Sequence, residues 1–180
     1  KFEEREGIVL GDVAKLDNKT IINGDAQEWI DAIRLKLPNV NIYAYQQYGR
    51  KTNLKGLTIV PYMKEGFSEW LSKRKINICL NQKLSFEMLP VESQSLGIPA
   101  IYRDMPQSLN EWIGNSGMCL NSPNEVAKFT AEIYENRKIW NTYSKLSIKN
   151  SSKNSVENLI ILLEKSIKKE IEIQKSKKAK

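Results

Sequence analysis

The feature that most constrains the fold is a regular alternation between short apolar runs and longer helical patterns. Several of the apolar runs are rich in β-branched residues and almost continuous in apolarity, which is typical of strands buried on both faces of a sheet. We expect strands at GIVLG (7–11), VNIYAY (40–45), LTIV (57–60), INICL (76–80), PAIY (99–102) and GMCL (117–120). Helices are expected at 25–37, 66–74, 87–96, 123–136 and 154–173. This order predicts an α/β fold in which helices sandwich a parallel sheet.

Length and composition indicate one structured domain. A chain of 180 residues with 41% hydrophobic residues can bury one sizeable core. We therefore expect a domain over residues 1–153, a C-terminal helix at 154–173 and a basic tail at 174–180. The helix at 154–173 either closes the core of this domain or crosses over to a second domain.

The positive charge of the chain is concentrated at its C-terminal end. The formal net charge is +7, and residues 165–180 carry seven lysines against Glu170 and Glu172, which is +5. Such a tail is typical of a solvated helix terminus, and the alternative is contact with an anionic membrane surface. Nucleic acid is not an expected partner, because the tail has no interleaved aromatic residues.

Residue types that are missing exclude several kinds of chemistry from this chain. It contains no histidine, so it has no histidine general base, no histidine metal ligand and no Ser-His or Cys-His nucleophile. The phosphate-binding motifs of P-loop NTPases and of dinucleotide oxidoreductases do not occur. Cys79 and Cys119 lie in apolar runs, which indicates buried reduced thiols and a cytoplasmic protein, peripheral to a membrane if the tail binds one.

Parallel sheets bind ligands at the edge where their strands end. Polar loops that contain lysine or glycine follow the runs ending at Gly11, Tyr45, Val60 and Leu80. The helix at 87–96 begins at the same edge, where its free N–H groups and its dipole favour an anion such as phosphate. The loop just before that helix therefore has the make-up of a phosphate or sugar cradle. Glu92 either accepts hydrogen bonds from a pair of hydroxyls or is an ordinary surface glutamate.

Residues 85–144 resemble the C-terminal, donor-binding domain of retaining glycosyltransferases with the GT-B fold. Ser85-Phe86 matches the loop of that family, Glu92 its second glutamate, and Leu96-Gly97-Ile98-Pro99 its Gly-x-Pro step. Residues 111–114 are similar to the Glu-Val-Val-Gly turn, 117–120 to the strand after it, and 124–129 to the next helix. With the upstream strands and helices, the resemblance covers most of residues 7–150. It implies a Rossmann-like parallel sheet equivalent to the C-terminal half of the GT-B fold.

The resemblance also implies roles at a nucleotide-sugar site. Glu92 would hold the ribose hydroxyls, and the backbone amides of residues 85–88 would hold the sugar and the diphosphate. The base would rest against the loop after the strand at 57–60, and a lysine would grip the diphosphate. Neither a divalent metal nor another cofactor is required in that scheme. The residues expected at the donor site are Lys15, Lys19, Val60, Tyr62, Met63, Ser85, Phe86, Glu87, Met88 and Glu92.

The chain departs from the family pattern at three positions. Leu84 stands where the family has its first acid, and Asp12 stands where the family has an arginine. Glu87 stands where the family has glycine, so its side chain would fill part of the sugar pocket. These departures indicate either a rebuilt donor site or a lost one.

Two functional hypotheses follow from the resemblance. The first is the donor-binding domain of a retaining, metal-independent hexosyltransferase. GT-B enzymes place catalysis between two domains, and this chain, which begins at Lys1, is too short for both. We therefore expect an N-terminal acceptor domain, joined in cis or supplied by a partner chain in trans. The second hypothesis is a catalytically inactive glycosyltransferase-like module that serves interaction or scaffolding.

Two other groups of residues have simpler interpretations. Tyr43, Tyr45 and Tyr48 lie close together in sequence, and Tyr43 and Tyr45 share one face of a strand. Such a group is interpreted as core and rim packing rather than as a platform for stacking on sugars. Arg103 and Asp104 follow the strand at 99–102 and are expected to form a local ion pair in a loop.

Overall fold

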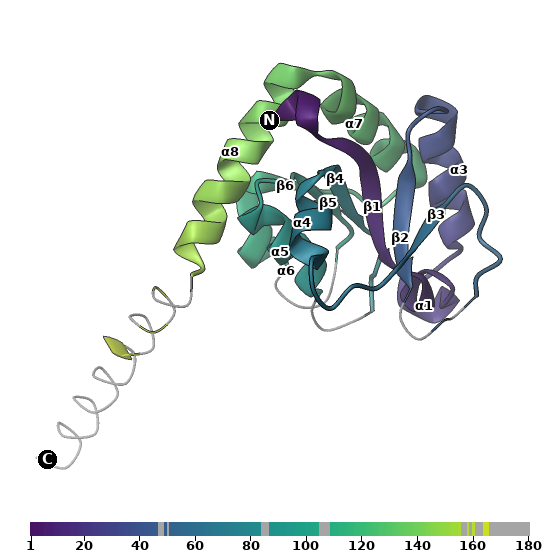
Figure 1. The fold of residues 1–180 in the computed structure, drawn as a ribbon, viewed down its shortest axis with the longest axis horizontal. Helices are drawn as coiled ribbons and strands as arrows, with labels where there is room; N and C mark the ends of the chain where they lie inside the picture. The colour runs from purple at the N-terminus through teal and green to yellow at the C-terminus, as the bar shows by residue number, and fades with distance from the viewer. Residues whose placement is uncertain are drawn as a thin grey trace, which may run out of the picture.

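The structure is a computed structural model that describes residues 1–46, 49, 51–83, 87–104, 109–155, 158, 160, 164 and 165. Within these residues one sheet of six strands is parallel throughout, in the order β3-β2-β1-β4-β5-β6 (Figure 1). The strands are β1 (Glu6–Asp12), β2 (Ile42–Gln46), β3 (Thr58–Pro61), β4 (Arg74–Cys79), β5 (Ala100–Tyr102) and β6 (Gly117–Cys119). Each overlaps a predicted run, so the predicted α/β parallel sheet is confirmed.

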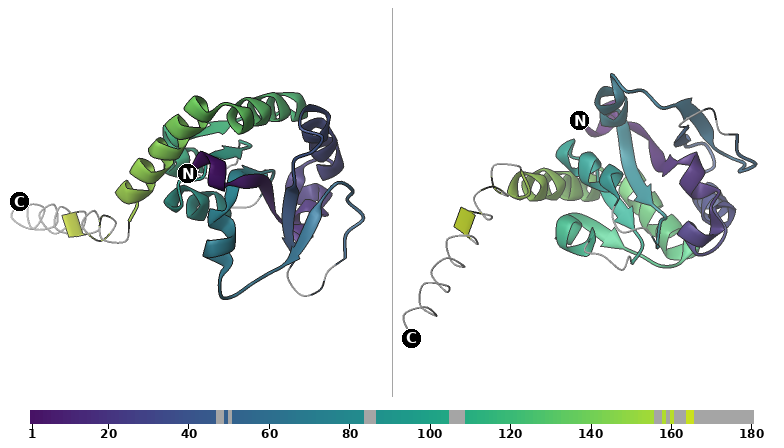
Figure 2. Two further views of the ribbon diagram at one scale, coloured as in Figure 1. Left: turned by 45° about the horizontal axis from the view of Figure 1, so that its top comes forward. Right: turned by 90° about the horizontal axis from the view of Figure 1, so that it is seen from below.

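Helices cover both faces of this sheet (Figures 1 and 2). They are α1 (Val13–Leu16), α2 (Lys19–Ile22), α3 (Ala26–Lys36), α4 (Phe67–Ser72), α5 (Met88–Ser95), α6 (Leu109–Ile113), α7 (Pro123–Glu135) and α8 (Arg137–Lys153). The 3₁₀ turns are η1 (Phe2–Glu4) and η2 (Gly114–Ser116). The segment at 111–114, which we expected to be a turn, is the end of α6 running into η2.

The larger part of the core lies between the sheet and helices α3 and α7. An apolar stripe of α3 is buried here, with Ile30 and Ile33 fully inaccessible to solvent and Trp29 at 4% exposure. These side chains meet alternate residues of the central strands, such as Ile8 and Ile76. Burying one such side chain contributes about 1.5–3 kcal/mol, so this layer supplies much of the stability of the fold.

The opposite face of the sheet is covered by α4 and α5. Val9 of β1, Leu71 of α4, Leu89 of α5 and Ile98, which follows α5, form one buried cluster with Tyr45. Tyr43 and Tyr45 of β2 are both buried, and the Tyr43 ring packs at 5.9 Å from Trp70. The packing interpretation of these tyrosines is therefore confirmed. Tyr48 lies outside the described residues.

Gly97, just after the end of α5, packs closely against α8. Gly97 has φ +69°, a left-handed backbone that favours glycine at the end of a helix. A Cβ at this position would lie 3.0 Å from the Cδ1 of Ile148 and 3.1 Å from the Oγ of Ser144, both in α8. The glycine of the Gly-x-Pro step is thus required both by backbone conformation and by the close approach of α8.

Helix α8 itself is not among the sequence predictions. It begins directly after α7 and lies beside the N-terminus, where Phe2 packs edge-on against Trp140 with ring centroids 5.7 Å apart. The predicted helix at 154–173 falls mostly outside the described residues. No helix within the described part of the chain has the length and apolarity needed to cross a membrane.

Arg103 corrects a further expectation. Its side chain is buried rather than paired with Asp104 in a loop. The guanidinium donates hydrogen bonds to the carbonyl oxygens of Ile22 and Leu80 and to the side chain of Gln82. Arg103 therefore ties the end of β5 to α2 and to the segment after β4, both of which border the carboxyl edge of the sheet.

Candidate functional site

The carboxyl edge of the sheet brings together the ends of β1 and β4 and the start of α5. Asp12 is the last residue of β1, and its Oδ1 accepts a hydrogen bond from the backbone N–H of Ala14, which caps α1. Gly11, with φ +115°, precedes it at an irregularity in the β1–β2 ladder. The short helix α1 then carries Lys15 back over the edge of the sheet.

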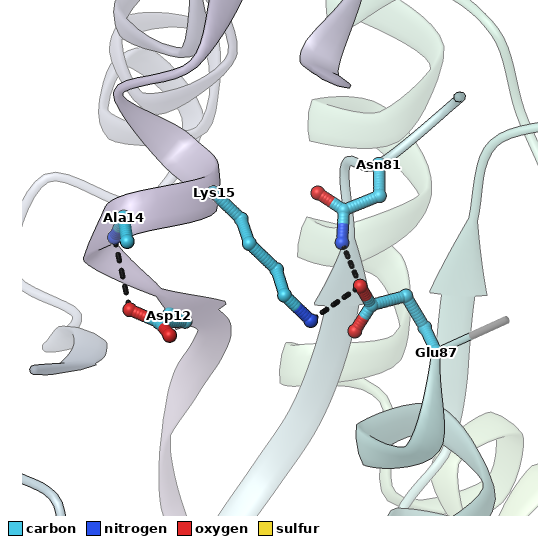
Figure 3. Close-up of polar contacts among 5 residues, drawn as sticks. All are labelled: Asp12, Ala14, Lys15, Asn81 and Glu87. Carbon is cyan, nitrogen blue, oxygen red and sulfur yellow. Dashed lines mark hydrogen bonds and ion pairs between the residues drawn. The ribbon is translucent and has the colours of Figure 1, made fainter. Parts of the chain in front are cut away.

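Lys15 and Glu87 form the central contact of this site. The Lys15 Nζ lies 2.6 Å from Glu87 Oε1, and the Asn81 side-chain amide donates to the same oxygen (Figure 3). Glu87 is only 5% exposed, whereas the Lys15 side chain is 34% exposed. A buried carboxylate is costly unless it is paired and hydrogen-bonded, and here it has both a cation and an amide donor.

The pair leaves very little free volume at the strand ends. The cavity lined by Gly11, Asp12, Lys15, Asn81 and Glu87 measures about 10 Å³, which is the lower limit for one water molecule. Two buried carboxylates, Asp12 and Glu87, line it against the ammonium of Lys15. In this conformation the strand ends hold two carboxylates and one ammonium with almost no free space between them.

Tyr45 lies near both the Lys15–Glu87 contact and Glu92. Burial raises the pKa of Tyr45 above its usual value, and the nearby charges of Asp12, Glu87 and Glu92 raise it further. The tyrosine hydroxyl therefore lies within electrostatic reach of all three carboxylates. Glu92 itself is exposed on α5, and partial desolvation raises the pKa of its carboxyl. An exposed carboxylate next to a partly desolvated surface can accept hydrogen bonds from a bound polyol.

Two of the residues predicted for the base, Val60 and Tyr62, lie beside the same tyrosine. The Tyr62 ring follows β3, is 46% exposed and lies 5.8 Å from the ring of Tyr45. Val60 packs against the cluster that contains Tyr45, and Met63 is half-buried. Met88, the first residue of α5, is 55% exposed. An accessible aromatic ring, that of Tyr62, thus lies beside Tyr45.

Lys19 is not part of this arrangement. Its Nζ pairs with Asp25 at 2.8 Å on the surface, and it lines a separate groove of about 520 Å³ beside α3. Of the two lysines considered from the sequence, only Lys15 meets the start of α5. The two predicted cradle residues Ser85 and Phe86 lie outside the described residues, as does Leu84.

Sequence reasoning did not single out Asn81. This residue follows β4 by two positions, is 6% exposed and holds Glu87 in place. A polar residue directly after a buried strand is the signal that could have identified it. Within the described ranges, no three histidine, cysteine, aspartate or glutamate side chains gather as a potential metal site.

The buried thiol of Cys79 lies behind the cavity. Burial raises its pKa to about 12, with the charge of Glu87 as a smaller contribution. Cys79 and Cys119 are both free, as predicted, but only Cys79 is buried, whereas Cys119 is half-buried. A thiol that stays protonated at neutral pH is a poor nucleophile, so Cys79 serves packing at this edge.

The fold is shared with solved glycosyltransferases. S. aureus TarM, crystallised with UDP, superposes with a TM-score of 0.68 at 15% identity over 86% of this chain and 34% of that chain. The C-terminal domain of the glycosyl transferase group 1 protein LpcC from Francisella tularensis gives 0.64 at 13% identity, over 86% of this chain and 90% of that one. Sucrose-phosphate synthase from Thermosynechococcus elongatus gives 0.67 at 14% identity, over 94% and 46%.

These likenesses establish the class of fold. The chain has the Rossmann-like architecture of the C-terminal domain of GT-B glycosyltransferases, as the sequence resemblance predicted. It spans about a third of the length of TarM, 34%, and nearly the whole of the LpcC domain, 90%. No family model matches the sequence, and no curated protein matches it significantly.

Proposed function

We propose that this chain is the nucleotide-sugar-binding domain of a glycosyltransferase that transfers a hexosyl group to an acceptor. The observation that carries the proposal is the convergence of predicted donor residues on one edge of a GT-B-type sheet. Lys15 comes from the segment after β1, Tyr62 from the segment after β3, and Glu92 from α5. Parallel α/β sheets bind their ligands at this edge. The UDP complex of TarM, which shares the fold, supports a nucleotide ligand here.

The residues would divide the ligand between them. Lys15 supplies the positive charge for the diphosphate, together with the first amides of α5. Glu92 accepts hydrogen bonds from the ribose hydroxyls. The exposed ring of Tyr62 offers the base a face to stack on, as aromatic rings do in other nucleotide sites. With a lysine and a helix dipole to neutralise the phosphates, the transfer needs no divalent metal.

Catalysis needs a second domain. The proposed reaction retains the configuration of the sugar, and the acceptor is bound by an N-terminal domain in cis or by a partner chain in trans. The short span of this chain relative to TarM and the synthase supports that division. The free cysteines are consistent with a cytoplasmic protein, and the basic tail would let it contact an anionic membrane.

The test is calorimetric titration of the chain with UDP, GDP, ADP and dTDP, each with and without Mg²⁺. One nucleotide should bind without Mg²⁺, and Glu92→Ala should weaken its binding about tenfold or more, since a hydrogen bond to a charged group contributes about 1.5–3 kcal/mol. Glu132→Ala, which removes an exposed glutamate of α7, is the control and should bind like the unmodified chain. Equal affinity in the Glu92 and Glu132 variants would argue against the ribose role.

A second candidate is an inactive glycosyltransferase-like module that serves interaction. The observation that favours it is the buried Lys15–Glu87 pair, which leaves a cavity of about 10 Å³ at the strand ends. If no nucleotide binds either to the unmodified chain or to Glu87→Gln, in which the pair is broken, the inactive interaction module becomes the better description.

A further inference from the structure

The inference concerns how the Lys15–Glu87 pair affects an anionic ligand, and it rests on the proposed donor site. Two hydrogen-bond donors, the ammonium of Lys15 and the amide of Asn81, converge on one oxygen of Glu87 from different elements (Figure 3). They belong to α1 and to the segment after β4, and the carboxylate belongs to the residue that precedes α5. Convergent donors around a negative oxygen are the arrangement that proteins use to bind phosphate.

Glu87 does not serve the helix that it precedes. It is the N-cap residue of α5, yet its side chain makes no capping hydrogen bond. Ser122, Asn136 and Asp25, by contrast, each cap a helix with their side chains. The glutamate side chain instead turns away from α5 and toward Lys15. It can leave that position without uncapping the helix, because no helix hydrogen bond depends on it.

The partner lysine is reachable from solvent. Its side chain is 34% exposed, although the carboxylate that it contacts is almost fully buried. An incoming anion could therefore contact the ammonium from outside while Glu87 still occupies the inner side. Asp12, which is also buried at this edge, cannot donate to an anion and adds negative charge.

We propose that the Glu87 carboxylate is an internal anion that occupies the phosphate position of this site and competes with the ligand for Lys15 and Asn81. The chain binds a diphosphate only when Glu87 swings away. The apparent affinity is therefore lowered by the fraction of molecules in which the pair is open. Glu87 is in this sense an autoinhibitory residue, and removing its charge should expose a ready-made anion site.

The experiment compares the binding of inorganic pyrophosphate and UDP to the full 180-residue chain and to its variants by calorimetry. Glu87→Gln keeps the shape of the side chain and removes its charge. It should bind both probes about tenfold or more tightly than the unmodified chain. Glu69→Gln, which removes an exposed glutamate of α4, changes the net charge equally and should leave both affinities unchanged. Adding Lys15→Met to Glu87→Gln should abolish the gain.

Other outcomes separate this inference from the proposed function. If the unmodified chain binds UDP and Glu87→Gln binds it no more tightly, the competition is disproved while the donor site stands. If Glu87→Gln gains affinity for pyrophosphate but binds UDP no better than pyrophosphate, the competition is supported and the nucleotide site is not. If Glu87→Gln and Glu87→Ser are folded by circular dichroism and bind neither probe, no anion site lies beneath Glu87, and the inference is overturned.

Discussion

The guanidinium of Arg103 lies 4.4 Å from the centroid of the Trp29 ring, so that the end of β5 is joined to α3 across the core. The same group donates to the carbonyl oxygens of Ile22 and Leu80. Burial lowers the pKa of this arginine, yet it stays charged, because arginine remains protonated in proteins. One buried cation, Arg103, thus holds both α2 and the segment after β4, which border the candidate site.

Replacing Arg103 with methionine should lower the free energy of unfolding by about 2–4 kcal/mol. The change leaves two buried carbonyl oxygens without their donor and removes the contact with Trp29. Thermal unfolding followed by circular dichroism would show a fall of roughly 2–4 °C for each kcal/mol. Arg137→Met, which removes an exposed ion pair with Glu3, is the control and should change the stability by less than about 0.5 kcal/mol.

Lys15 and Lys19 should differ in their contribution to stability. Lys15→Met leaves the buried carboxylate of Glu87 with Asn81 as its remaining donor, so we expect a loss of about 1–3 kcal/mol. Lys19→Met breaks an exposed pair with Asp25, which solvent screens, and should cost clearly less than Lys15→Met. Urea unfolding of both variants measures the difference. Equal losses would mean that the Lys15–Glu87 contact is no stronger than a surface ion pair.

Gly97→Ala should destabilise the contact between α5 and α8. Forcing alanine into a left-handed backbone costs roughly 1–2 kcal/mol, and the new methyl group would also press on Ile148. Gly66→Ala provides the matched control, because Gly66 has φ +80° and nothing within 4 Å of the added Cβ. We expect the larger loss at Gly97 in denaturant unfolding. Part of that excess should be recovered when Ile148 is shortened to alanine.

The pH dependence of stability should report on Glu92. Desolvation raises the folded-state pKa of this carboxyl, so the fold favours its neutral form. The corresponding stabilisation is present below the unfolded-state pKa and is lost as the pH rises through the raised folded-state value. Glu92→Gln should therefore match the unmodified chain in acid and be the more stable of the two at neutral pH. A stability difference that does not vary between pH 3 and 8 would contradict this assignment.

The two cysteines should react at different rates in the folded chain. Cys79 is 4% exposed, and its pKa is raised to about 12, so little thiolate is available at pH 8. Cys119 is only half-buried, although burial also raises its pKa. Alkylation followed by mass spectrometry should label Cys119 first and Cys79 only after unfolding. Simultaneous labelling of both cysteines in the native chain would show that the cavity lined by Glu87 and Cys79 is open to solvent.

The sequence was sufficient for the sheet and for four of the eight described helices around it, namely α3, α4, α5 and α7. The apolar runs at 76–80 and 99–102 are buried on both faces, so their strand character is visible without any partner. The apolar stripe of α3, formed by Trp29, Ile30 and Ile33, is equally visible in the sequence. Helix α8 was missed for a physical reason: besides Trp140, its buried positions are the small polar residues Ser144 and Ser147, which produce no apolar periodicity.

The candidate site shows where sequence reasoning reaches its limit. The order of strands and loops was enough to place Lys15, Tyr62 and Glu92 at one edge, because the carboxyl ends of parallel strands always meet there. Only the tertiary structure decided that Lys15 faces α5 while Lys19 faces the solvent. The helical conformation is interrupted between α1, which ends at Leu16, and α2, which begins at Lys19. The two lysines, four positions apart, therefore point in different directions.

The direction of Glu87 was decided in the same way. The sequence by itself placed a glutamate at the start of the predicted helix at 87–96, and only the family resemblance implied that its side chain fills part of a sugar pocket. Whether it caps its helix, faces the solvent or meets a cation depends on Lys15 of α1 and Asn81 after β4, which only packing brings into contact with it. Backbone order follows from local pattern and burial, whereas side-chain partners follow from long-range packing, and the electrostatics of this site belong to the second kind.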